Sequence, residues 1–226
     1  MSPPSNHDLA ARMAELARSL AEERTLAAVL REVTSTAVDL IPGVDTAGIL
    51  YVKKGGQFDS VAGTSELPHT LDELQMKFDE GPCLHAALAD TIVQTADFRT
   101  ETRWPQYSAA AVELGVLSGL SFKLYTSGRT AGALNLFGFQ PNEWDGDAET
   151  AGSVLAAQAA AALIAAQHEE HLQAALLTRD RIGQAKGVIM ERYRVDDVRA
   201  FEMLRQLSQE SNTKLIEVAA RVIDSR

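Results

Sequence analysis

The feature that most constrains the fold is the segment 147–193, which contains no proline and consists mainly of good helix formers. A periodic segment much longer than an ordinary globular helix predicts a coiled coil or a connecting rod. Residues 154–166 read VLAAQAAAALIAA, and thin alanine side chains suit close helix pairing. Two interpretations stay open at this point: a parallel dimer formed through the alanine-rich stripe, or packing of the helix on the chain's own sheet.

Two glycines four residues apart, Gly183 and Gly187, lie in the second half of this helix with Lys186 between them. Each glycine costs roughly 1 kcal/mol relative to alanine in a helix interior, so helix propensity has not set these positions. On a helical wheel Lys186 lies on the apolar arc with Ala185 and Ile189, where its stem can pack while its ammonium reaches water or a phosphate. The glycine pair therefore predicts a flank without side-chain bulk, which another helix or an RNA can approach closely.

Two shorter amphipathic helices follow after short connections. The first reads DVRAFEMLRQLSQES and has Asp196 or Asp197 available as its N-cap. The second reads KLIEVAARVIDS and is expected to start at Asn212 or Thr213. The predicted inner stripes are Val198, Phe201, Leu204 and Leu207 in the first, and Leu215, Val218, Ala219 and Val222 in the second. The pattern indicates a small three-helix bundle.

Residues 26–165 follow a different pattern, in which short strands alternate with short helices. An amphipathic helix ends at Pro42 and Gly43, and the strands DTAGILYVKK and QFDSVAG flank the turn-forming pair Gly55 and Gly56. Helices are predicted in LPHTLDELQMKFDE and WPQYSAAAVELG, and further strands in TIVQTAD, LSGLSFKLYT and TAGALNLFGFQ. An antiparallel sheet with helices over its faces is the natural way to cover this set, so the predicted fold class is α+β.

Charge is divided unevenly along the chain. The net charge of −10 over 226 residues argues at first against a nucleic-acid partner. Residues 176–226 hold 10 basic and 8 acidic side chains, a net charge of +2, so the preceding part carries −12. The charge of the C-terminal part permits a nucleic-acid role without establishing one.

Several classes of function are disfavoured by the sequence. Cys83 is the only cysteine, which excludes an internal disulfide and a cysteine-cluster metal site within one chain. The sequence has no phosphate-binding glycine loop, nucleophile elbow or paired-histidine metal motif, so we expect no enzyme activity. The N-terminus lacks a basic leader before an apolar run, and the apolar segment 154–166 is too short to span a bilayer. We therefore expect a cytoplasmic protein without a membrane anchor.

The C-terminal phrases RIGQAKGVIMERY and AFEMLRQLSQESNTKLIEVAARVI closely resemble the ANTAR family, the RNA-binding modules of bacterial transcription antitermination regulators. The resemblance spans residues 179–223 and includes both glycines. It implies a three-helix module that, usually as a dimer, binds an RNA with paired hairpin loops and so prevents a terminator from forming. The chain departs from the family pattern at Arg194, where glycine is frequent, and at Thr213 and Ile216, where a basic residue is frequent.

The resemblance implies an RNA interface on this bundle. Sequence-specific RNA recognition mostly targets loops whose bases can stack and form hydrogen bonds. The expected contacts are Lys186, Arg192, Arg194, Lys214 and Arg221 to phosphates or bases, Gln184 and Asn212 through hydrogen bonds, and Tyr193 through stacking. Structural roles stay open for Arg192 and Arg221 as solvated charges, Asn212 as a helix cap and Tyr193 as a core residue.

Residues 26–165 resemble a GAF domain, a small-molecule or signal-sensing module, in the order of their elements and in the phrases DTAGILYV, DEGPCLHAAL and GALNLFGFQPNEWDGDA. The resemblance implies a small-molecule ligand or a protein partner as input, and the identity of any ligand or cofactor stays open. Cys83 and His85 are the candidate ligand or redox residues, because a cysteine near a helix start can have a lowered pKa. A buried, inert Cys83 is the alternative.

The predicted organisation is a helical segment at residues 1–25, a GAF-like sensor at 26–165, a connecting helix at 147–178 and an ANTAR module at 179–226. The leading hypothesis is a cytoplasmic, homodimeric regulator whose sensor alters binding to hairpin-containing leader transcripts. Two alternatives stay open: a protein-interaction adaptor that uses the same bundle, and a haem or redox sensor with another output.

Overall fold

The computed structural model describes residues 25–52, 58–83, 91–126, 129–142 and 144–225. Contacts within the chain divide it into two compact units, Met1–Ala166 and Gln167–Arg226. The predicted helical segment at residues 1–25, apart from Thr25, and the turn at Gly55 and Gly56 lie outside the described residues.

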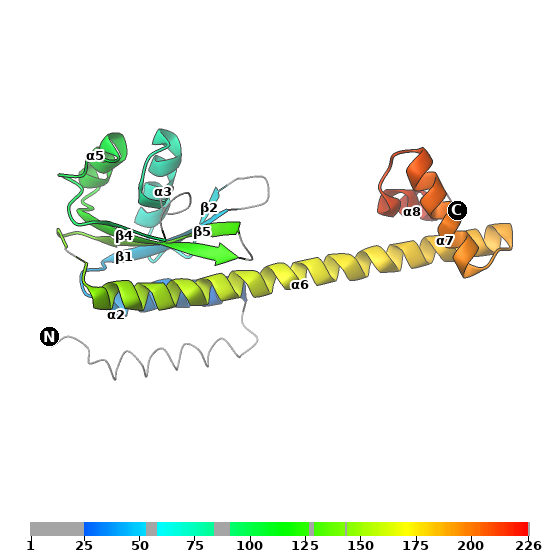
Figure 1. The fold of residues 1–226 in the computed structure, drawn as a ribbon, viewed down its shortest axis with the longest axis horizontal. Helices are drawn as coiled ribbons and strands as arrows, with labels where there is room; N and C mark the ends of the chain where they lie inside the picture. Colours follow the sequence, from blue (N-terminus) through cyan, green and yellow to red (C-terminus); the bar gives the residue numbers. More distant parts are fainter. Residues whose placement is uncertain (1–24, 53–57, 84–90, 127–128, 143, 226) are drawn as a thin grey trace. The chain divides into compact units, whose positions relative to one another are not determined.

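The N-terminal unit is built on an antiparallel sheet whose strands lie in the order β2-β1-β5-β4-β3 (Figure 1). The strand bounds are Thr46–Val52 for β1, Phe58–Val61 for β2, Ile92–Thr95 for β3, Ser118–Thr126 for β4 and Arg129–Gly138 for β5. At the centre of the sheet Ile49 of β1 lies opposite Leu134 of β5. The predicted antiparallel sheet, and with it the α+β class, is confirmed.

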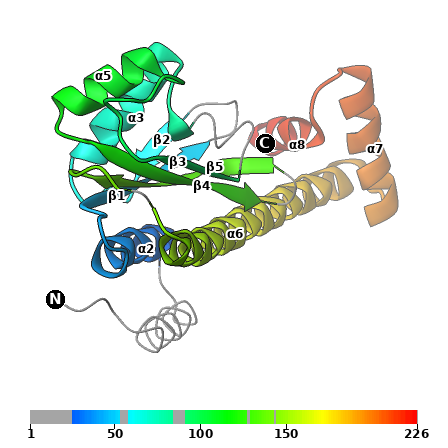
Figure 2. The ribbon, with the colours of Figure 1, turned by 60° about the vertical axis from the view of Figure 1, so that its left-hand side comes forward.

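Helices cover both faces of this sheet. In Figures 1 and 2, α2 (Leu26–Leu40) and the first part of α6 (Gly146–Tyr193) lie on one face, and α3 (Leu67–Phe78) and α5 (Pro105–Glu113) lie on the other. The core between the sheet, α2 and α6 includes Val33, Ala37, Phe122, Leu134, Leu155, Ala159 and Leu163. The first half of the long helix thus packs on the chain's own sheet, as one of the two interpretations of its alanine-rich sequence predicts.

Gly152 lets α6 lie close against β4. A Cβ atom at this position would overlap the Phe122 ring, so a larger residue would require the ring or the helix to shift. Alanines on the same helix face keep the approach close over the following turns, because their side chains add little bulk.

The opposite face of the sheet packs against α3 and α5 through a second core, which includes Leu71, Val93, Phe98, Tyr107 and Phe137. Glu80, just after α3, connects the two helices. Its carboxylate accepts hydrogen bonds from the backbone N–H groups of Gln106, at 2.8 Å, and Tyr107, at 3.1 Å. These groups lie in the first turn of α5, where N–H groups lack intrahelical partners.

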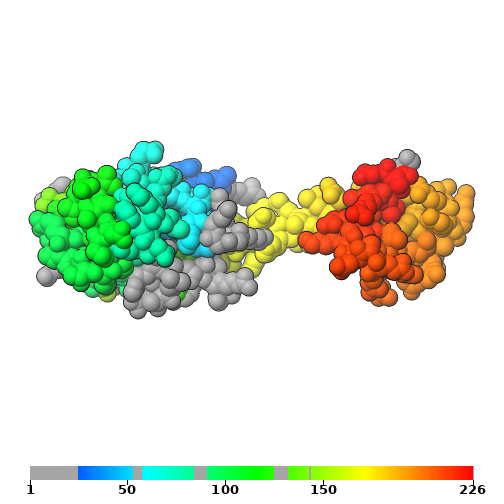
Figure 3. All heavy atoms as spheres, turned by 90° about the horizontal axis from the view of Figure 1, so that it is seen from above, coloured from blue at the N-terminus to red at the C-terminus, as the bar shows by residue number. Residues whose placement is uncertain are grey.

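The C-terminal unit contains the end of α6 together with α7 (Asp197–Glu210) and α8 (Leu215–Asp224). Its core consists of Ala185, Ile189, Ala200, Leu204, Val218 and Ala219. Figure 3 shows the side chains of α7 and α8 packed together. Asp196 caps α7 as predicted, since its side chain accepts a hydrogen bond from the Arg199 N–H at 2.8 Å.

The face that α7 buries differs from the predicted one. Ala200 and Leu204 are buried, whereas Val198, Phe201 and Leu207 are 67%, 40% and 49% exposed. The predicted stripe advances in steps of three residues, and each step falls about 60° short of a full turn, so the stripe winds off the contact face. The small Ala200 side chain instead lets α7 approach the bundle core closely.

The start of α8 also differs from the prediction. Its N-cap is Lys214, which makes no side-chain capping hydrogen bond, rather than Asn212 or Thr213. Asn212 has φ of +47° and follows the end of α7 in the left-handed region, a conformation that asparagine adopts more readily than most residues. The inward position predicted for Val218 and Ala219 is confirmed.

Among the helices that the structure describes, α6 is long and apolar enough to cross a membrane, judged by length and composition only. Core helices of soluble proteins meet the same criteria. The most apolar part of α6 places Leu155, Ala159 and Leu163 in the core beneath the sheet, so the finding is weak evidence for a membrane span.

Arg194 ends α6 in the left-handed conformation, with φ of +55°. This conformation costs a residue with a Cβ atom roughly 1–2 kcal/mol. We therefore expect Arg194→Gly to raise the free energy of unfolding of the C-terminal unit by about 1 kcal/mol. Amide hydrogen exchange of α7 and α8 in the full chain measures the change.

Arg194→Ala is the matched control, because it removes the guanidinium but keeps the backbone strain. It should give no gain, and Asn212→Gly should give a smaller gain than Arg194→Gly. An equal gain from Arg194→Ala would mean that the arginine side chain, not the backbone, limits stability.

Candidate functional site

The glycine pair of α6 leaves one flank of the C-terminal unit open. A Cβ atom added at Gly183 or Gly187 would meet no heavy atom of the described chain within 4 Å. Ala185 and Ile189, between and beyond the glycines, are buried in the bundle core. The thinned flank is therefore not used for helix packing within this unit, and it is accessible to another molecule.

Lys186 leaves the helix between the two glycines, and its side chain is only 21% exposed. Its ammonium forms an ion pair with Asp197 at the start of α7 and lies 5.9 Å from the centroid of the Phe201 ring. The Asp197 side chain is 65% exposed, so water screens the pair, and such pairs contribute little to stability. The ammonium is thus held in position but can exchange its carboxylate partner for a phosphate.

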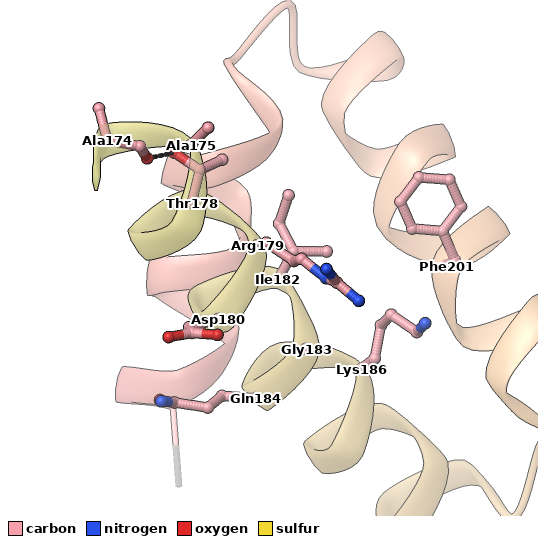
Figure 4. Close-up of a pocket in the computed structure, with 10 residues that line it drawn as sticks. All are labelled: Ala174, Ala175, Thr178, Arg179, Asp180, Ile182, Gly183, Gln184, Lys186 and Phe201. Carbon is pink, nitrogen blue, oxygen red and sulfur yellow. Dashed lines mark hydrogen bonds between the residues drawn. The ribbon is translucent and has the colours of Figure 1, made fainter. Parts of the chain in front are cut away.

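A groove of about 830 Å³ lies between α6 and α7 in the C-terminal unit. It is lined by Ala174, Ala175, Thr178, Arg179, Asp180, Ile182, Gly183, Gln184, Lys186 and Phe201. In Figure 4 the Arg179 and Lys186 side chains extend from α6 toward the helix that carries Phe201, whereas Asp180 and Gln184 extend from the other side of α6. The groove combines two cations with an exposed aromatic ring, the chemistry that contacts phosphates and stacks bases.

Two of the predicted RNA-contact residues, Gln184 and Lys186, line this groove. Among its other lining residues, Arg179 and Phe201 also have side chains suited to contact RNA, and the sequence analysis did not predict them. Arg179 lies seven residues before Lys186, so its position on the same helix face was available from the sequence. Phe201 was assigned to the inner stripe of α7, and its exposure follows only from the packed bundle.

The predicted residues at the end of α6 have separate environments. Arg192 donates hydrogen bonds to the Ser225 carbonyl, at 2.9 Å, and to the Ser225 hydroxyl, at 3.4 Å, and so links α6 to the end of α8. Tyr193 is largely exposed and lines a second, smaller cavity of about 150 Å³. Arg194 is exposed and lies 3.6 Å from Glu191. Of the three, Arg192 has a structural role that the sequence did not indicate.

The remaining predicted residues lie away from the groove lining. Asn212 and Lys214 are exposed in the turn between α7 and α8, and Arg221 is exposed on α8. The structure therefore places the predicted contact residues on several parts of the bundle surface rather than in one site.

In the N-terminal unit, Cys83 is buried in a small cluster with Leu50 and Ala133. Burial, and then the charge of Asp72, raise the pKa of its thiol well above the ordinary value. The lowered pKa on which the redox expectation depended is thus wrong, because the thiol is buried beside an acidic rather than a basic side chain. His85 lies outside the described residues.

The described residues contain no group of three or more histidine, cysteine or acidic side chains that could hold a metal ion. His69 is exposed, and its imidazole lies 3.6 Å from the Glu73 carboxylate on the same helix.

Two family models match the chain. Residues 170–223 match the ANTAR domain, and residues 23–164, more than half of the chain, match the GAF domain. The GAF match lies in the N-terminal unit, which contains the sheet, and the ANTAR match lies in the C-terminal unit, which contains the groove. No match was found among curated proteins.

Solved structures share the fold of the N-terminal unit. The GAF domain of a Coxiella burnetii phosphoenolpyruvate-protein phosphotransferase has a TM-score of 0.58 at 16% identity, covering 74% of this chain and 99% of its own. The corresponding Acinetobacter domain has a TM-score of 0.55 at 18% identity, covering 74% and 97%. The reduced fRMsr of Staphylococcus aureus has a TM-score of 0.51 at 12% identity, covering 72% and 99%. At these identities the similarity is one of fold alone.

The open flank generates a stability prediction. Because Gly183 and Gly187 are helical and unopposed, we expect Gly183→Ala and Gly187→Ala each to raise the free energy of unfolding of the C-terminal unit by about 0.5–1 kcal/mol. Urea unfolding followed by circular dichroism measures the change. The contrasting variant is Ala185→Leu, which adds bulk in the core and should destabilise the unit by about 1–3 kcal/mol.

Proposed function

The chain belongs to the GAF domain family and carries a C-terminal ANTAR domain, and on this premise we propose that it is a signal-responsive, RNA-binding regulator of transcription antitermination. GAF domains are sensory and ANTAR domains act in RNA-binding antitermination, so an input and an output are joined on one chain. The observation that carries the proposal is the groove beside α6, where Arg179, Lys186 and Phe201 lie within the segment matched by the ANTAR domain.

In the proposed complex, the groove receives the loop of an RNA hairpin. A splayed base stacks on the exposed Phe201 ring, and Arg179 contacts the phosphate backbone. Lys186 exchanges Asp197 for a phosphate, and Gln184 supplies hydrogen bonds from the groove wall. The flank at Gly187 lets the sugar-phosphate backbone approach α6 without meeting a side chain.

We propose that the protein acts as a homodimer. Leu172, Leu176 and Leu177 are 63%, 51% and 66% exposed on α6. Apolar side chains one helical turn apart form a stripe that suits pairing with a second helix. A second copy would remove these leucines from water and would place two bundles on an RNA with two hairpins.

The input is proposed to be a small molecule or a protein partner that acts in the cytoplasm on the GAF domain. Helix α6 is the candidate route to the output, because its residues contribute to the core beneath the sheet and to the core of the bundle. A ligand shifts RNA binding only if it binds one conformation of the sensor more tightly than another. The proposal therefore requires two states of the sensor that differ at α6.

RNA binding tests the proposal directly. The full chain should bind a leader RNA with two hairpins more tightly than a scrambled RNA of the same length, and the protein-interaction alternative expects no such preference. Lys186→Ala combined with Lys214→Ala should weaken binding and reduce the slope of log affinity against log salt concentration. The slope falls because fewer phosphates are neutralised and fewer counterions are therefore released on binding. Fluorescence anisotropy at several salt concentrations measures both quantities.

Arg205→Ala is the matched control, because Arg205 is an exposed base on α7 outside the groove lining. It should change affinity and slope less than the two lysine substitutions. Asp197→Asn should tighten binding by removing the carboxylate that competes with phosphate for Lys186. An unchanged slope in the lysine variants would reject the assignment of these residues, and Gly187→Leu with full affinity would reject the role of the flank.

The dimer is tested by sedimentation of the full chain. The wild type should sediment as a dimer at micromolar concentration, and Leu172→Glu combined with Leu176→Glu should shift it toward monomer, because the substitutions place repelling charges in the stripe. A matched double substitution on the opposite face of the same helix, His171→Glu and Thr178→Glu, should leave the dimer intact. A wild type that sediments as a monomer at this concentration would contradict the proposed homodimer.

A further inference from the structure

Asp72, on α3, is buried against the sheet and is the acceptor of three side-chain hydrogen bonds. The Ser60 hydroxyl of β2 donates to Oδ2 at 2.7 Å. The amides of Gln75 and Asn135 donate to Oδ1 at 3.3 Å and 3.2 Å. A single carboxyl group thus connects α3 to an edge strand and to a central strand of the sheet.

The network continues from Asp72 to the turn at residues 81–83. The Gln75 side-chain oxygen accepts a hydrogen bond from the Cys83 backbone N–H at 2.8 Å. Gly81 has φ of +134°, and a Cβ atom there would lie 2.4 Å from the same oxygen, so only glycine lets the turn come this close. Gln75 therefore links the carboxyl group of Asp72 directly to the backbone of the turn.

The amide orientations around Asp72 are fixed by their other partners. The Gln75 oxygen is occupied by the Cys83 N–H, and the Asn135 oxygen accepts from the Ser121 hydroxyl at 2.9 Å. Both amides must therefore present NH₂ to Oδ1. Only the Ser60 hydroxyl can reverse, donating to an ionised carboxylate or accepting from a neutral carboxyl.

Few titratable groups of the described residues face Asp72. They are His69 on its own helix, Cys83, and Tyr107 of α5. On the sheet, Lys123 lies two residues beyond Ser121 on the same face of β4, and Asp59 of β2 points to the opposite face from Ser60. The described parts of β1, β3 and β5 that flank the network contribute no acid or base to this face; they are Thr46–Val52, Ile92–Thr95 and residues 132–138. Tyr51 of β1 packs on the opposite, α2 side of the sheet.

The exposed acids and bases nearby are already engaged or point outward. Glu73 lies 3.6 Å from His69, Lys77 lies over the Phe78 ring, and Glu80 is hydrogen bonded to the start of α5. Among the described residues, none forms an ion pair with Asp72. Within the described part of the chain, only the electrostatic attraction of His69 offsets the burial of an ionised Asp72. Such a buried charge without a direct ion pair is unfavourable even when its oxygens accept hydrogen bonds.

We propose that Asp72 is a proton-operated latch of the sensor domain: the neutral carboxyl holds α3, β2 and the turn at residues 81–83 together, and loss of the proton releases the turn. Burial raises the pKa of Asp72 to about 7 against the lowering effects of Ser60, His69 and the two amides, so both forms occur near neutral pH. Ser60, half-buried on the edge strand, is the path by which the proton exchanges with water. The latch stands independently of the proposed RNA binding.

The direction of the pH dependence follows from the two pKa values. The pKa of Asp72 is about 7 in the folded chain and 3.8 in its unperturbed state, so the folded chain binds more protons between these values. The contribution of Asp72 to stability is thus fully present below pH 3.8 and is lost as pH rises toward about 7. Urea unfolding of the wild type should show this decline, and Asp72→Asn should remove it.

Cys83, the only cysteine, reports on the turn. We compare the rate of its reaction with a maleimide in the full-length wild type and in Asp72→Asn, from about pH 5.5 to about pH 8.5. Asparagine keeps one acceptor oxygen and, like the neutral carboxyl, donates toward Ser60. The ratio of the wild-type rate to the Asp72→Asn rate cancels the ordinary increase of the thiolate fraction with pH, because that increase occurs in both proteins. It should increase by about fivefold or more across this range, with a midpoint near pH 7.

The competing electrostatic effect has the opposite sign. An ionised Asp72 raises the pKa of the Cys83 thiol and would make the ratio fall, so a rising ratio reports access and not thiol chemistry. Ser60→Ala removes a hydrogen bond that lowers the pKa of Asp72. The midpoint of the decline in stability should therefore lie at higher pH in Ser60→Ala than in the wild type. This second variant keeps the test valid if Asp72→Asn does not fold. A flat or falling ratio, or a midpoint that Ser60→Ala leaves unchanged or lowers, overturns the latch.

Discussion

The structure depends on one constraint, the unbroken helix α6, whose residues belong to two hydrophobic cores. Its first part contributes Leu155 and Leu163 to the core beneath the sheet, and its last part contributes Ala185 and Ile189 to the bundle. Neither unit can therefore form its complete core without this helix. A change in the sensor that alters how α6 packs acts on an element that the bundle also needs, which makes the helix a physical candidate for coupling rather than a passive spacer.

The elements of the fold were predictable because each has a local signal. Alternating apolar residues and turn formers mark the strands, and the absence of proline marks α6. Side-chain exposure was less predictable. The spacing of Val198, Phe201 and Leu207 fits an inner stripe, but the small Ala200 decides which face of α7 packs. Asp72 gave no signal at all, because an aspartate on a short amphipathic helix reads as solvated until the partners from β2 and β5 are brought beside it.

The two glycines of the bundle have no explanation within the described chain. Glycine disfavours a helix, and neither position has a positive φ or a close neighbour that would require it. Gly152 on the same helix is the useful contrast, because the Phe122 ring would collide with any side chain there. The two glycines fit the proposed approach of RNA to this flank, and the cations and aromatic ring of the adjoining groove suit a partner that carries phosphates and bases.

Electrostatics in the bundle favours exchange of partners over rigid binding. Water screens the carboxylate side of the ion pair between Lys186 and Asp197, so the pair contributes little free energy. Breaking it to release the lysine therefore costs little free energy. A phosphate bound there as proposed would compete with Asp197 for Lys186 and would meet Arg179 on the same helix face. Because the chain as a whole is acidic, with a net charge of −10, such local cations must be concentrated in one place to attract RNA at all. If RNA binds in the groove as proposed, the negative charge of the rest of the chain opposes non-specific binding. The same uneven charge that weakens overall affinity for RNA then favours binding at the groove over binding elsewhere on the surface.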